Sequence, residues 1–223
     1  ARLGIPQERL HNFGDLRASA PALSVDTHAL GELNKAIAGR PIWVAASSHA
    51  EDEAAIIDAC RLVLKQQPNT LLIWAPRHPQ RATAIIAAAS GLSIQQRSLN
   101  AQFTKDTQIY LADTLGELGT LFSSSEIVFL GGSFGDEGGH NPYEPACFGC
   151  VVVSGENVRN HKDGFAALAG VGAAIIVKDG VELGHEINAL LSSGIAAQKG
   201  KAGRTLVAKA NGAADKSVAL ILS

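Results

Sequence analysis

Short apolar runs alternate with segments of helical periodicity along most of this chain, and this alternation restricts the fold more than any other feature. The runs are continuous and rich in Val and Ile, which is typical of strands buried on both faces of a parallel sheet. The predicted strands are Pro41–Ser47, Thr70–Ala75, Thr107–Leu111, Ile127–Leu130, Val151–Ser154 and Ala173–Val177. Strands and helices in this order predict an α/β fold with a doubly wound, Rossmann-like parallel sheet.

The segments between the strands predict the covering helices. They are Glu51–Gln67, Gln80–Ser90, Leu115–Ser123, Tyr143–Phe148, Lys162–Gly170 and Val181–Ser192, and Gly194–Leu222 predicts one or two more. Residues 1–39 are less regular, so we divide the chain into a linker and edge segment (1–39) and a ligand-binding domain (40–223). The chain starts at Ala1 and contains no Met, which leads us to expect one domain of a longer protein.

Composition excludes several classes of function. The formal net charge is −2, so the chain lacks the basic surplus that neutralises phosphates, and we expect no nucleic acid partner. No stretch of about 18 uninterrupted apolar residues is present, and the start of the chain has no signal-peptide pattern. We therefore expect a soluble domain.

The cysteines are an odd set: Cys60, Cys147 and Cys150. Cys147-x-x-Cys150 has the spacing of a redox pair, but no βαβ unit of the thioredoxin kind precedes it. We interpret these residues as two thiols near a junction between a helix and a strand. A reducing cytosol is the simplest setting for such a chain.

The strongest candidate for a ligand site is the glycine-rich segment from Gly131 to Pro145, which follows the predicted strand Ile127–Leu130. Open α/β sheets bind ligands where such a turn leads from a strand into a helix. Glycine lets the backbone approach an anion, and the free N–H groups of a helix start attract one. Glu144 follows His140 by four residues, so both would lie on one face of the short helix, where the Glu144 carboxylate can accept hydrogen bonds from a ribose diol. The segment predicts a nucleotide-sugar site; a purely structural helix cap is the alternative.

Polar residues also follow other predicted strands. Arg77, His78 and Pro79 come after Thr70–Ala75, and the Arg77 guanidinium suits phosphate or carboxylate. Ser47 and Ser48 end the first strand and can bind a phosphate or cap the next helix. Asn160 follows the strand Val151–Ser154. An ordinary capped helix is the alternative at each position.

Metal and hydrolase chemistry are weaker interpretations. His140 and Glu144 supply two metal ligands at most, whereas catalytic zinc takes three protein ligands, so we expect no metal. The chain has no G-x-S-x-G elbow for a serine hydrolase, no dinucleotide fingerprint and no P-loop.

Taken together, these residues resemble the carboxyl-terminal half of the Kdo transferases, which transfer 3-deoxy-D-manno-octulosonic acid from its CMP donor. The match runs in the family's order from about Gly14 to Val177. It is carried by Gly14–Arg17, by Arg40–His49, by Pro76–Pro79, by Asp113–Leu118, and by Gly131–Phe134 together with Gly138–Pro145, whose G-G-H-N-x-x-E-P pattern is the most specific.

The resemblance implies one half of a GT-B glycosyltransferase, with the active site between two Rossmann-like domains. It implies that this half binds CMP-Kdo without metal or other cofactor. The full enzyme would transfer Kdo to lipid A precursor, in lipopolysaccharide biosynthesis, at the cytoplasmic face of the bacterial inner membrane. The family's general base, a Glu, lies in the amino-terminal domain with the membrane anchor and the acceptor groove. We therefore expect no catalytic residue in this chain, and no activity from it alone.

The resemblance also implies a set of donor-binding residues. Arg77, His78 and Pro79 would lie beside the CMP phosphate and cytosine, Gly138, Gly139, His140 and Asn141 would form a backbone cradle, and Glu144 would take the ribose hydroxyls. Ser47, Ser48 and Asn160 are secondary candidates. Two departures concern the donor's sugar: the acidic Gly135-Asp136-Glu137, where the family is more apolar, and Asn160-His161, where Asn-Phe is usual.

Two alternatives remain open at this level. One is the donor domain of another GT-B enzyme that uses a UDP-sugar, or of a related epimerase. The other is a domain that binds a small ligand without catalysis.

Overall fold

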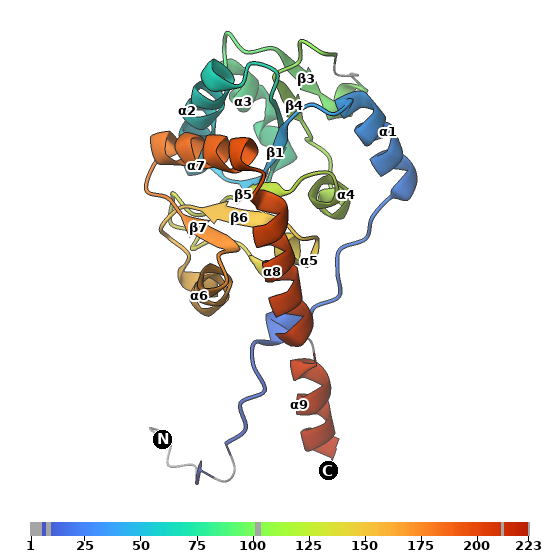
Figure 1. Ribbon diagram of the computed structural model, residues 1–223, viewed down its shortest axis with the longest axis vertical. Helices are drawn as coiled ribbons and strands as arrows, with labels where there is room; N and C mark the ends of the chain where they lie inside the picture. Colours follow the sequence, from blue (N-terminus) through green and yellow to red (C-terminus); the bar gives the residue numbers. More distant parts are fainter. Residues whose placement is uncertain (1–5, 8–9, 101–103, 211, 223) are drawn as a thin grey trace.

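A parallel β-sheet forms the centre of the molecule, as the sequence predicts (Figure 1). The computed structural model describes residues 6–7, 10–100, 104–210 and 212–222. In this part of the chain seven strands pair in the order β3-β4-β2-β1-β5-β6-β7, and all pairs are parallel. The strands are β1 Ile42–Ser48, β2 Leu71–Pro76, β3 Ile94–Gln96, β4 Ile109–Leu111, β5 Ile127–Leu130, β6 Val151–Ser154 and β7 Ala174–Ile176.

Helices cover both faces of the sheet. The covering helices are α1 Thr27–Ile37, α2 Ala50–Gln66, α3 Ala82–Ala88, α4 Leu118–Ser123, α5 Tyr143–Cys147, α6 Lys162–Gly170, α7 Gly180–Ser193 and α8 Ala196–Ala210. A further helix, α9 Ala213–Leu222, follows them, and 3-10 turns lie at Leu16–Ser19, Pro79–Arg81, Arg97–Leu99 and Arg159–His161. Side chains alternate along β1, so Trp43 and Ala45 pack with α2, α3 and α7. Val44 and Ala46 face the opposite core, to which α1, α4, α5, α6 and α8 contribute.

The chain order places a switch point between β1 and β5. From β1 the chain moves outward through β2 to the β3–β4 edge, and it then returns to β5, on the other side of β1, and continues to β6 and β7. The loops that follow β1 and β5 therefore diverge to opposite sides. Such a crevice at the carboxyl ends of parallel strands is where open α/β sheets bind ligands.

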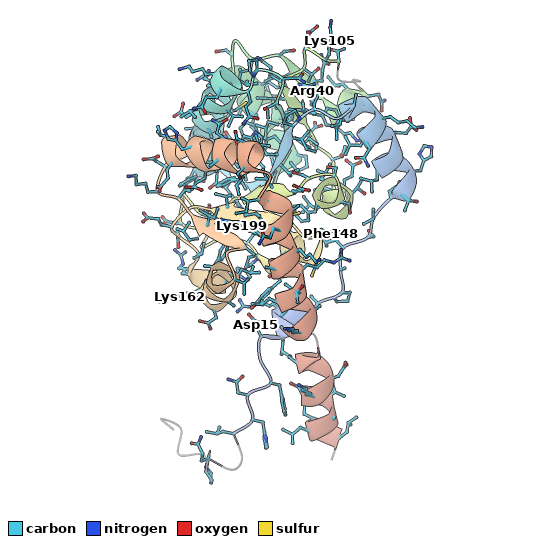
Figure 2. The ribbon with its side chains drawn as sticks, in the orientation of Figure 1. Asp15, Arg40, Lys105, Phe148, Lys162 and Lys199 are labelled. Atoms are coloured by element: carbon cyan, nitrogen blue, oxygen red, sulfur yellow. The ribbon has the colours of Figure 1, made fainter. Side chains whose placement is uncertain are left out.

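The opposite edge of the sheet is closed by Arg40. Its guanidinium donates hydrogen bonds to the carbonyls of Asn69 at 3.0 Å, Thr104 at 3.1 Å and Thr107 at 2.7 Å. Figure 2 shows Arg40 at this end of the molecule, near Lys105. The Arg40 side chain thus joins the segments that enter β1, β2 and β4. These contacts stabilise the end of the sheet where the strands begin.

Two elements differ from the sequence-based expectations. The short strand β3 was not predicted, and α1 lies within residues 1–39, which the sequence describes as irregular. The Asp26 carboxylate caps α1 by accepting from the Ala29 N–H at 2.9 Å, Ala38 ends the helix at φ 51°, and α1 packs against α4. At one end of the molecule α9 and residues 10–14 project from the body (Figure 1). None of the described helices has the length and apolar composition needed to cross a bilayer.

Candidate functional site

The first half of the glycine-rich loop binds a carboxylate of the protein itself. Asp52, fully buried in the first turn of α2, accepts the N–H groups of Gly132 at 2.7 Å, Ser133 at 3.2 Å and Phe134 at 3.1 Å. It also accepts the N–H of His49 at 2.8 Å. The expectation of an open anion site directly after β5 is therefore wrong for this half, because Asp52 fills it.

The second half of the loop, Gly138–Asn141, has no such internal partner. Gly138 and Gly139 adopt φ +87° and +79°, which a residue with a side chain rarely adopts. The Gly139 N–H donates to the Gly132 carbonyl at 2.6 Å. The N–H groups of Gly138, His140 and Asn141 donate to no group in the described part of the chain. The cradle that the sequence predicts is thus a turn with three N–H donors that no described residue uses.

The loop after β6 holds this turn in place. The Asn160 side-chain amide donates to the Glu137 carbonyl at 2.6 Å, and the Asn160 N–H donates to the Gly138 carbonyl at 2.9 Å. Arg17 in turn donates to the Asn160 carbonyl. A Cβ on Gly138 would lie 2.7 Å from the Asn160 Nδ2. Asn160 therefore positions the loop, and its direct contact with a ligand stays a prediction.

Helix α5 begins later than the sequence suggests. It starts at Tyr143, whose N–H is capped by the Asn141 side-chain oxygen at 3.2 Å. His140 therefore precedes the helix, and the argument that His140 and Glu144 share a helical face is wrong. Glu144 lies in the first turn, half-buried, with the Asn141 Nδ2 3.5 Å from its Oε1. Burial raises the pKa of the Glu144 carboxyl.

Three histidines from three strand ends meet beside the loop. The Nε2 atoms of His49, after β1, and His140, after β5, are 3.0 Å apart, and their rings stack with centroids 5.2 Å apart. His78, after β2, packs edge-on against His49 at 5.4 Å. Burial, with smaller contributions from His49 and Arg77, lowers the pKa of His140 to about 4, against the opposing effect of Asp52. His49 was not among the predicted site residues, although it follows Ser48 directly.

The remaining predicted site residues are of two kinds: buried serines at the end of β1, and more exposed residues after β2. The Ser48 hydroxyl is fully buried and accepts the Trp74 indole N–H at 2.7 Å, so it joins β1 to β2 and is closed to a ligand. Ser47 lies at an irregularity of β1 with φ 56° and is almost fully buried. The Arg77 side chain is exposed at the site, while its backbone N–H donates to the Ser48 carbonyl at 3.0 Å. Pro79 starts the 3-10 turn that His78 precedes.

Neither the cysteines nor a metal cluster adds chemistry in the described residues. Cys147 and Cys150 carry free thiols, and burial raises the pKa of Cys150 to about 12. A thiol with so high a pKa is a poor nucleophile at neutral pH, which agrees with two structural thiols. Among the residues described, no three His, Cys, Asp or Glu side chains are grouped to hold a metal ion.

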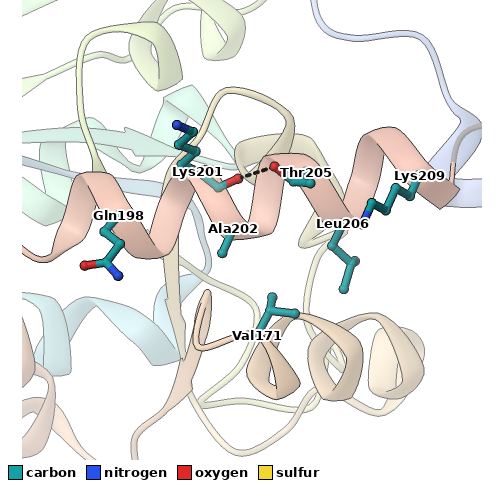
Figure 3. Close-up of a pocket in the computed structure, with 7 residues that line it drawn as sticks. All are labelled: Val171, Gln198, Lys201, Ala202, Thr205, Leu206 and Lys209. Carbon is teal, nitrogen blue, oxygen red and sulfur yellow. Dashed lines mark hydrogen bonds between the residues drawn. The ribbon is translucent and has the colours of Figure 1, made fainter.

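A separate pocket of about 510 Å³ lies beside α8, and none of its lining residues belongs to the glycine-rich loop (Figure 3). It opens between α8 and Val171, which precedes the amino end of β7, and it is lined by Val171, Gln198, Lys201, Ala202, Thr205, Leu206 and Lys209. The switch point lies at the carboxyl ends of the strands. This pocket is therefore no part of the candidate site.

Comparisons with known proteins agree on one family. A 3-deoxy-D-manno-octulosonic acid transferase of Haemophilus influenzae is 31% identical over 99% of this chain and 53% of its own length. The enzyme of the same name from Rickettsia felis is 33% identical over 81% of the chain and 39% of its own length. The chain thus spans about half the length of the curated relatives it matches. No family model matches the chain.

Structural similarity points to the same half of those enzymes. The C-terminal CMP-Kdo binding domain of WaaA from Acinetobacter baumannii has a TM-score of 0.72 and 26% identity, over 81% of this chain and 96% of that domain. A putative UDP-N-acetylglucosamine 2-epimerase from Listeria monocytogenes, at 16% identity and a TM-score of 0.59, shares the fold. The chain belongs to the Kdo transferase family and corresponds to the carboxyl-terminal domain of its members.

Proposed function

We propose that this chain binds the donor CMP-Kdo for a glycosyltransferase that transfers Kdo to lipid A precursor. One observation carries the proposal: the N–H groups of Gly138, His140 and Asn141 have no acceptor in the described part of the chain, at the switch point of the sheet. Backbone donors on a glycine turn are the arrangement that binds phosphate in many α/β proteins. The proposal extends to this chain the binding of CMP-Kdo, for which the matched domain of WaaA is named.

Each part of the donor has a partner under this proposal. The cradle takes the phosphate, with Arg77 supplying a positive charge that suits a phosphate oxygen pair. His78 and Pro79 lie at the neighbouring strand end and contact the nucleotide. Glu144 accepts the ribose hydroxyls, because its carboxylate lies one residue into α5 and, among the described residues, the Asn141 amide is its one hydrogen-bond partner. Ser47 and Asn160 remain secondary candidates.

The chemistry of transfer requires the rest of the enzyme. An inverting displacement at the anomeric carbon expels CMP, and oriented N–H donors stabilise the charge that develops on the departing phosphate. The general base, the acceptor groove and the membrane contact belong to the amino-terminal domain under this proposal. No metal and no other cofactor takes part, and this domain alone transfers no Kdo.

Replacing Glu144 by Gln tests the ribose contact. Because a charged acceptor contributes more than a neutral amide, we expect CMP to bind about tenfold more weakly to the E144Q variant. Calorimetric titration with CMP and with 2′,3′-dideoxy-CMP measures the contact, since the dideoxy nucleotide should bind both proteins equally. Glu156→Gln, at an exposed position after β6, is the matched control. Equal weakening of both nucleotides would contradict the ribose role, and tighter binding of UMP than of CMP would favour a UDP-sugar enzyme.

A further inference from the structure

A carboxylate and two imidazoles form a continuous chain beside the cradle. The Glu137 Oε1 lies 3.7 Å from the His49 Nδ1, and the His49 Nε2 lies 3.0 Å from the His140 Nε2. The other Glu137 oxygen is buried and has no hydrogen-bond partner among the described residues. His140 itself contributes one of the three unused backbone N–H groups. The chain therefore runs from a partly buried carboxylate to the predicted phosphate site.

The distance between the two imidazole rings limits how many protons the Glu137–His49–His140 chain can hold. Two ring nitrogens 3.0 Å apart share a single hydrogen, because two N–H groups facing each other would repel. Without a further proton, the pair of histidines is neutral. One more proton goes to an Nδ1 atom, and in the described part of the chain the His49 Nδ1 is the one with a carboxylate beside it. The pair thus gains at most one positive charge, paired with Glu137.

Charged groups on the surrounding elements act on the His140 ring. Arg77 from the β2 end and His161 from the β6 loop oppose a charge on His140, and Asp52 from α2 favours it. The Asp52 oxygens are already engaged by backbone N–H groups. The low pKa of His140 indicates that the His140 ring is neutral when no anion is bound. A phosphate dianion in the cradle would offset the charge of Arg77 and favour protonation.

We propose that the Glu137–His49–His140 chain takes up one proton when the bond between CMP and the sugar breaks, and so stabilises the phosphate of the bound CMP. This proposal rests on the proposed function. The donor phosphodiester carries one negative charge. When the bond between the phosphate oxygen and the anomeric carbon breaks, its electron pair stays on the phosphate, which becomes a monoester with a second charge. The acceptor hydroxyl loses its proton to the base in the other domain. The chain takes a separate proton from solvent and places a positive charge beside the new negative one.

Calorimetric titration in buffers of different ionisation enthalpy tests the proposal, because it counts the protons exchanged on binding. At neutral pH, we expect CMP to bind with uptake of roughly half to one proton, since a bound dianion raises the pKa of a neighbouring histidine. The monoanionic methyl ester of CMP should bind with much less uptake. The His49→Gln variant should lose the uptake and bind CMP about tenfold more weakly, with the methyl ester little affected.

Two further variants separate the outcomes. Glu137→Gln keeps the main-chain clasp of the loop, which uses the Glu137 carbonyl, and should reduce the uptake without unfolding the loop. His185→Gln changes an exposed histidine on α7 and should retain full uptake. If CMP does not bind, the proposed function fails. If CMP binds without proton uptake, or if the His49→Gln and Glu137→Gln variants both retain it, the proton proposal is overturned while donor binding stands.

Discussion

The two halves of the glycine-rich loop have similar sequences and opposite roles. In the first half, the N–H groups of Gly132, Ser133 and Phe134 bind the buried carboxylate of Asp52. In the second half, the N–H groups of Gly138, His140 and Asn141 have no acceptor in the described chain. A glycine-rich turn after a strand is therefore not a ligand site by itself; what decides is whether the fold supplies an internal anion.

The first half also explains how the second is held. Asp52 ties the start of α2 to the loop after β5, across the switch point between β1 and β5. A Cβ on Gly131 would lie 2.6 Å from the Ser48 Cα, so the two strand ends meet at backbone contact. A rigid platform next to the cradle reduces the ordering cost when a ligand binds.

Removing the internal anion should have the largest effect. In an Asp52→Ala variant, buried N–H groups lose their charged acceptor, so we expect the free energy of unfolding to fall by about 3–5 kcal/mol. Chemical denaturation measures the loss. Glu51→Gln, at an exposed residue in the same helical turn, is the control and should change little. A loss below about 1 kcal/mol would show that the first half does not depend on Asp52.

A side chain in the second half should impair binding more than stability. Gly138→Ala forces a residue with a Cβ to φ +87° and places that Cβ 2.7 Å from the Asn160 Nδ2. We expect a loss of stability of about 1–2 kcal/mol and a CMP affinity reduced by more than about tenfold. Gly31→Ala is the matched control, because a Cβ there meets nothing within 4 Å. Unchanged CMP affinity in a folded G138A variant would remove the cradle from the site.

A further expected effect concerns pH, and it too belongs to the second half. The pKa of His140 is about 4 in the folded chain against 6.5 ordinarily. The unfolded chain therefore binds a proton at higher pH than the folded chain, so the stability associated with neutral His140 is complete above pH 6.5. It is lost as the pH falls toward 4.

The His140→Asn variant removes that dependence. Between pH 7 and pH 4, the wild type should lose on the order of 1–3 kcal/mol more stability than this variant. Denaturation curves at several pH values provide the comparison, with His185→Gln as the control. Parallel curves for wild type and H140N would show that the His140 ring is not held neutral by its surroundings.

The sequence predicted the sheet, and the end of it at which polar residues gather, because both depend on local patterns. Continuous apolar runs marked β1, β2, β5 and β6, and the polar residues after them converge at one edge by the rule for parallel strands. The short edge strand β3, Ile94–Gln96, is half-buried and has no apolar run, so its pattern is weak. Helix α1 was missed because its surroundings are irregular, although Asp26 caps it and Ile37 is buried.

The site was harder to predict in detail because its roles depend on long-range pairing. The sequence offers no sign that Asp52, 80 residues before Gly132, fills the first half of the loop. No sequence pattern indicates that the Ser48 hydroxyl pairs with the Trp74 indole N–H on the neighbouring strand. The start of α5 was misplaced because Asn141 caps Tyr143, and that cap excludes His140 from the helix. His49 lies in the motif Arg40–His49, but its contact with His140, 91 residues later, does not follow from the sequence.

Heteronuclear NMR with ¹⁵N-labelled protein and increasing CMP tests the central claim most directly, because each backbone amide in the loop reports separately. The account predicts concentration-dependent shifts of the Gly138, Gly139, His140 and Asn141 amides. The signals of the Gly132, Ser133 and Phe134 amides should shift little, because these N–H groups remain hydrogen-bonded to the Asp52 carboxylate. Shifts confined to the first half, or none in either half at CMP concentrations that saturate binding elsewhere, would contradict it.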